Sequence, residues 1–149
     1  MPNSKEKETE QTPLGIRLRG IELLNGSLIR PEDTKEELTA FQFNLNLIHD
    51  VDQQKKLVFV VVNVDISSVT LQKQVGALSV SHIYELANFE DAVTMLEDGN
   101  FSLVEALKDV LNSISISTTR GVMFSTFKGT FLHHALLPIV NPKQIQQTV

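Results

Sequence analysis

Two groups of side chains in this 149-residue chain could bind a metal ion. His133 and His134 are adjacent imidazoles, but no cysteine and no spaced pair of carboxylates accompanies them to complete a ligand set. His49 stands beside Asp50 and Asp52 in a polar stretch, where acidic residues are more typical of a solvated turn than of a cation site. We therefore expect neither a metal nor another cofactor.

Motifs of the common enzyme classes are also missing from the sequence. No serine stands in a Gly-x-Ser-x-Gly elbow, no glycine-rich phosphate loop precedes a Lys-Ser or Lys-Thr pair, and no dinucleotide fingerprint follows a strand-like segment. The chain contains no cysteine, which removes a thiol nucleophile, a thiolate zinc site and a disulfide framework. These features favour a binding protein over an enzyme and fit a reducing compartment.

The net charge and the hydropathy of the chain limit the kinds of partner that we expect it to bind. The formal net charge of −5 argues against general adhesion to nucleic acid or to anionic lipid. Arg17, Arg19 and Arg30 could form a small basic strip, although alternation also explains the first two as the solvent-facing side of a strand. No stretch approaches the roughly 20 apolar residues that cross a bilayer, and no signal peptide is recognisable. We expect a cytoplasmic protein without nucleic-acid partners or membrane insertion.

Alternating apolar residues predict four β-strands after a polar tail. Residues 1–13 are charged and polar without an apolar period, so we expect them to be disordered and residues 14–149 to form one domain. The first strand begins near Leu14, continues across a bulge at Gly20 and ends before Pro31. The remaining strands are expected at residues 41–47, 57–66 and 74–86.

The third expected strand is apolar on both faces. That pattern suggests a central position in the sheet, with a helix on one face and a partner subunit on the other.

A long helix is predicted over residues 102–127. Ser102 and Glu105 have the spacing of a capping box, which marks the helix start, and Gly129 supplies a left-handed C-cap. Residues 113–117 alternate like a strand, but apolar residues recur at helical spacing on both sides, so helix is favoured. Its small Ser, Thr and Gly residues suit close packing against a second helix.

The order of these elements resembles the SecB family of export chaperones, specifically its divergent SecB-like members. The resemblance spans about residues 14–146 and is strongest over residues 114–145. The residues that carry it are Thr119-Arg120-Gly121, Gly129-Thr130 and Leu137-Pro138-Ile139-Val140-Asn141-Pro142.

The resemblance implies an α+β fold. In it, a four-stranded antiparallel sheet carries the long helix and a short C-terminal helix on one face. It also implies a homo-oligomer, a dimer or a dimer of dimers, that holds unfolded or nascent polypeptide without ATP during protein export. Export members contact the translocation motor SecA, which makes SecA a second candidate partner. Other members are dedicated chaperones of antitoxins, so the alternative is an adaptor or interaction module for a single partner protein.

Client contacts are implied by the same resemblance. In the family, clients lie along apolar surface near the first strand, the loop after it and the terminal helix. The matching apolar residues are Leu24, Leu28, Ile29, Phe131, Leu136, Ile139 and Ile145. The alternative is that these residues fill the monomer core or a subunit interface, and surface exposure separates the two readings.

Overall fold

Four long antiparallel strands form the main sheet of the protein. The computed structural model describes residues 15–32, 38–141 and 147–148. The sheet order is β1-β4-β3-β2-β7, and the two-residue β7 pairs in parallel with β2. The expected four-stranded antiparallel sheet is confirmed, with β7 as a short addition. The bounds of these strands are β1 (Ile16–Leu28), β2 (Phe41–Asp52), β3 (Leu57–Ser68), β4 (Lys73–Leu86) and β7 (Gln147–Thr148).

Strand β3 lies in the centre of the sheet, as its apolar sequence predicts. Successive side chains of a strand point to opposite faces, so every second residue enters the core. On the inner face of β3 the fully buried residues are Val58, Val60, Val62, Val64 and Ile66. On the outer face Leu57, Phe59 and Val61 are only half-buried. The inner face is therefore the one that the rest of the chain covers.

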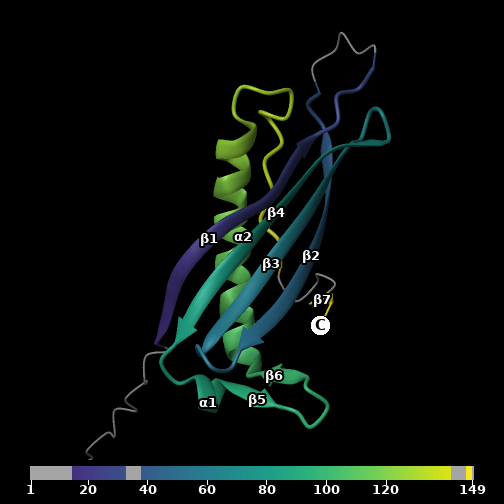
Figure 1. Cartoon of the computed structure of the whole chain (residues 1–149). Coiled ribbons are helices and arrows are strands. Elements are labelled where there is room, and N and C mark those ends of the chain that lie inside the picture. The colour runs from purple at the N-terminus through teal and green to yellow at the C-terminus, as the bar shows by residue number, and fades with distance from the viewer. Residues whose placement is uncertain (1–14, 33–37, 142–146, 149) are drawn as a thin grey trace, which may run out of the picture.

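The long helix α2 (Glu105–Phe127) covers the inner face and runs along the strands (Figure 1). Its buried side includes Leu111, Ile116 and Met123. Residues 128–141 return behind the same face towards the β2 edge (Figure 1). The helix over residues 113–117 is confirmed, since these residues lie within α2. No helix in the described ranges is long and apolar enough to span a membrane.

The predicted capping box at the start of this helix is wrong. Ser102 lies in the short strand β6 (Phe101–Leu103), where it pairs with Thr94 of β5 (Val93–Met95). Because the backbone of Ser102 belongs to this hairpin, the helix begins three residues later at Glu105, with Val104 at the N-cap position and no side-chain cap. A single turn of helix, α1 (Phe89–Ala92), precedes β5.

Two predicted glycine roles are confirmed. A register shift between Leu18 and Gly20 gives β1 its bulge, and a second shift follows between Leu23 and Asn25. Gly129 adopts a φ of +79° just after α2, a backbone conformation that glycine reaches without steric cost. The expected N-terminal tail lies outside the described residues. So does most of the segment expected to form the C-terminal helix, of which Gln147–Thr148 form β7.

Candidate functional site

The inner side of β1 carries apolar residues that α2 leaves uncovered. In the sheet register Leu18 pairs with Tyr84, and Leu23 pairs with Val80. Directly opposed residues of antiparallel strands share one face, so both leucines belong to the inner face. Tyr84 and Val80 are fully buried, whereas Leu18 is 40% and Leu23 50% exposed. The helix packs on β3 and β4, and the apolar inner face extends beyond it to the sheet edge.

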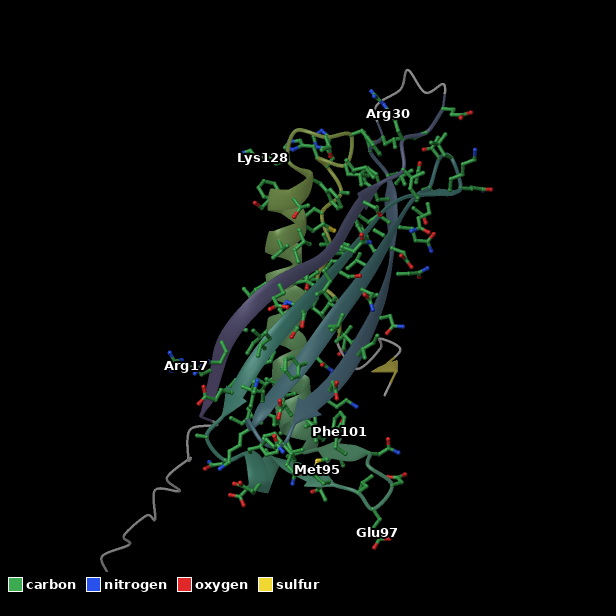
Figure 2. The ribbon with its side chains drawn as sticks, in the orientation of Figure 1. Arg17, Arg30, Met95, Glu97, Phe101 and Lys128 are labelled. Atoms are coloured by element: carbon green, nitrogen blue, oxygen red, sulfur yellow. The ribbon has the colours of Figure 1, made fainter. Side chains whose placement is uncertain are left out.

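Further apolar residues continue this surface along the whole strand. Arg17 and Arg30 mark its two ends (Figure 2). We define the β1 strip as the exposed large apolar residues of β1 and the residue that follows it: Leu18, Ile21, Leu23, Leu24, Leu28 and Ile29.

Strand β1 is also an edge of the sheet. Among the described residues it pairs with β4 alone, so one row of its backbone N–H and C=O groups faces away from the sheet. Such a row can pair with another extended chain. On the sheet side, Arg19 forms an exposed ion pair with Glu85 of β4 at 2.6 Å. The β1 strip therefore combines exposed apolar surface with an open backbone edge.

A second apolar group lies on α2 and on the segment that returns from it. We define the C-terminal patch as Phe124, Leu136 and Ile139, which are 51%, 58% and 93% exposed. Arg120 fixes this segment, because its Nε donates to the carbonyl oxygen of Leu137 at 2.7 Å and its Nη2 to that of Pro138 at 2.9 Å.

Most of the implied client residues lie at the surface. Leu24, Leu28 and Ile29 belong to the β1 strip, and Leu136 and Ile139 to the C-terminal patch. Phe131 is half-buried and packs against the core, which favours the alternative reading for this residue. Ile145 lies outside the described residues. A client-binding role for these positions stays a prediction.

The sequence reading missed four residues of these surfaces: Leu18, Ile21, Leu23 and Phe124. An apolar alternation indicates that one face of a strand is suited to burial. Whether a given strand lies under the helix depends on the order of strands in the sheet.

The described part of the chain contains no group of three or more His, Asp and Glu side chains placed to hold a metal ion. The rings of His133 and His134 instead contact each other edge to face, with centroids 4.9 Å apart. His133 also lies 6.3 Å from the ring of Phe124.

A mainly antiparallel sheet with one long helix on its inner face gives this protein an α+β fold. No protein-family model matches the chain, and no curated protein matches it. A solved structure does: the Mycobacterium tuberculosis Rv1957 SecB-like chaperone in complex with a ChAD peptide from the Rv1956 HigA1 antitoxin. The match covers 84% of this chain and 89% of that chain, with a TM-score of 0.56 and 11% sequence identity. At this identity the similarity shows the fold alone, which is SecB-like.

Proposed function

We propose that this protein is an ATP-independent chaperone that binds unfolded or nascent polypeptide on the β1 strip. One observation carries the proposal: the large apolar residues of β1 on the inner sheet face stay 40–50% exposed beside an unpaired strand edge. An extended polypeptide can pair with such an edge through its backbone and place alternate apolar side chains against the strip. Backbone pairing tolerates many sequences, which suits a protein that holds unfolded chains.

The breadth of the clientele distinguishes two versions of this function. A general holdase would serve protein export and contact SecA in the cytoplasm. A dedicated chaperone or adaptor would bind one partner, and the similar structure favours this version because its chaperone holds a peptide from an antitoxin. In both versions we propose a homo-oligomer, a dimer or a dimer of dimers, and we assign no catalytic reaction.

The first test measures client binding without nucleotide. Several reduced, unfolded polypeptides are mixed with the protein, and aggregation and solution mass are followed by light scattering. A general holdase suppresses aggregation of several clients near equal concentration and gains their mass. A dedicated chaperone acts on one polypeptide only. Failure to bind any unfolded chain would overturn the proposal.

A charged substitution in the β1 strip tests whether the client binds there. Leu23 is 50% exposed in the β1 strip, and Val69 is 53% exposed in the turn between β3 and β4. Leu23→Asp should weaken client binding about three- to tenfold or more, since covering the exposed half of this leucine contributes about 0.8–1.5 kcal/mol and the variant presents a carboxylate to the client instead. Val69→Asp is the matched control and should bind as the unchanged protein does. Equal binding by both folded variants would place the client elsewhere.

A further inference from the structure

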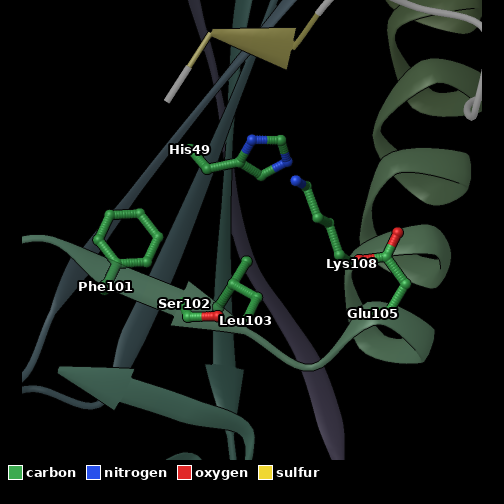
Figure 3. A pocket seen from close by; sticks show the side chains of 6 residues that line it. All are labelled: His49, Phe101, Ser102, Leu103, Glu105 and Lys108. Carbon is green, nitrogen blue, oxygen red and sulfur yellow. The ribbon is translucent and has the colours of Figure 1, made fainter. Parts of the chain in front are cut away.

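A pocket of about 200 Å³ lies away from the β1 strip, between the end of β2, strand β6 and the first turns of α2 (Figure 3). Phe101 and Leu103 give it apolar walls, and Ser102 lies between them on β6. The remaining lining residues are His49 from β2 and Glu105 and Lys108 from α2. The pocket is thus apolar on one side and polar on the other.

Buried polar atoms without partners lie in the polar wall and directly behind it. His49 is 5% exposed and Asn112 is fully buried, and the Nε2 atom of His49 lies 2.6 Å from Oδ1 of Asn112. An amide oxygen only accepts hydrogen bonds, so this contact assigns the ring proton to Nε2. Nδ1 of His49 and Nδ2 of Asn112 have no hydrogen-bond partner among the described residues. Buried polar atoms are rarely left unsatisfied, so the free acceptor Nδ1 and the free donor Nδ2 leave this wall short of hydrogen-bond partners.

Lys108 adds a positive charge to this wall. Its ammonium group reaches from α2 towards the His49 ring, while the Glu105 carboxylate stays on the helix side (Figure 3). Lys108 is half-buried, and no ion pair joins it to a carboxylate of the described residues. The first turn of α2 has no side-chain cap, so its free N–H groups add to the positive field, and the Glu105 carboxylate in the same turn opposes it. An anion would stabilise this arrangement.

We propose that this pocket binds a small carboxylate with an apolar body. The carboxylate pairs with the ammonium group of Lys108, and the apolar body packs against Phe101 and Leu103. An apolar cavity of about 150 Å³ holds benzene, so the pocket admits a ligand of the size of benzoate. Two sources share this chemistry: a free organic acid, and the terminal carboxylate of a polypeptide that ends in an apolar residue. The proposal is independent of client binding on the β1 strip.

The experiment compares acids with their neutral amides. Benzoate and benzamide, and a short peptide ending in phenylalanine with a free or an amidated carboxyl group, are titrated into the full chain. Calorimetry gives the affinity, and the NMR signals of the His49 imidazole report the place of binding. We expect at least one of the two acids to bind saturably and to shift the His49 signals, with the matching amide about tenfold weaker or worse. Tighter binding of benzoate indicates a free organic acid, and tighter binding of the peptide acid a polypeptide terminus.

Variants of two lysines on α2 complete the test. Lys108→Met should lower the affinity for the acid about tenfold or more, and Lys108→Arg should retain it. Lys128 lies at the opposite end of α2 (Figure 2), so Lys128→Met is the matched control and should bind as the unchanged protein does. The proposal is overturned if neither acid binds, if the amides bind equally well, or if folded Lys108→Met keeps full affinity. Should Lys108→Met fail to fold, the comparison of acids with amides on the unchanged protein decides.

Discussion

The hydroxyl group of Tyr84 lies 2.7 Å from the Oγ atom of Ser115, and this contact ties β4 to the middle of α2. Both residues are fully buried. One helical turn further on, Oγ1 of Thr119 lies 3.3 Å from Nε2 of His82, whose Nδ1 lies 2.9 Å from the carbonyl oxygen of Val60. Buried polar groups of the sheet thus find their partners on one side of the helix. Rotation of α2 about its axis would leave them unsatisfied.

Removal of the Tyr84 hydroxyl should destabilise the fold. Tyr84→Phe should lower the free energy of unfolding by about 1 kcal/mol, because it deletes a buried hydrogen bond and leaves Ser115 without this partner. Urea denaturation measures the change. In the double variant Tyr84→Phe with Ser115→Ala, the two losses should be less than additive, since both substitutions remove the same contact. Fully additive losses would contradict the coupling.

His82 should make the stability dependent on pH on the acid side. Burial lowers the pKa of His82 below its ordinary value of 6.5, partly offset by the hydrogen bond to Val60. As the pH falls through 6.5, the unfolded chain takes up a proton before the folded chain does. The free energy of unfolding should therefore be constant well above pH 6.5 and should decrease from there down to the folded pKa. Burial lowers the pKa of His49 as well, and this residue contributes in the same direction.

The variant His82→Gln tests whether His82 causes this decrease in stability at acidic pH. It should flatten the decrease in stability between neutral and acidic pH, measured by urea denaturation at a series of pH values. Tyr84→Phe is the control, because it weakens the same network without removing a titrating imidazole. Its stability should be lower by a constant amount across the range. A pH profile of His82→Gln that parallels the unchanged protein would refute the assignment.

Arg120 should hold the segment after α2 in place. Arg120→Ala deletes the hydrogen bonds to the carbonyl oxygens of Leu137 and Pro138. We expect the free energy of unfolding to fall by about 1.5 kcal/mol. Faster amide hydrogen exchange should follow at residues 135–140 and not in β3. Ser117→Ala is a control on an exposed position of the same helix. Unchanged exchange near Leu137 in Arg120→Ala would show that other contacts hold the segment.

Gly76 should be intolerant of larger residues because Leu132 packs directly over it. A Cβ atom at position 76 would lie 2.5 Å from Cδ1 of Leu132 and 3.2 Å from the carbonyl oxygen of Ser27. Gly76→Ala should therefore cost about 1–3 kcal/mol through displacement of Leu132. Thermal unfolding measures this loss. In the presence of Gly76→Ala, Leu132→Ala should cost less than it does alone, and equal costs would argue against the clash.

Local sequence determined most of the elements of this protein. The alternation in β2 and β3 and the apolar spacing in α2 predicted these elements because burial of one face or stripe is a property of neighbouring residues. Gly20 correctly predicted the bulge in β1, and Gly129 correctly predicted the end of α2. Both predictions succeeded because these backbone conformations depend on only a few neighbouring residues. The capping box at Ser102 failed because that residue pairs with Thr94 in a hairpin.

Tertiary structure decided which apolar residues are exposed and which polar residues meet. Leu18 and Leu23 face the same side of the sheet as the buried residues of β3, and they remain exposed because β1 takes the edge position beyond α2. His49 and Asn112 are 63 residues apart in sequence and come together only when the helix packs across the sheet. Exposure and long-range pairing depend on how the elements are stacked. That stacking is set by the summed packing of the whole core, which no local pattern contains.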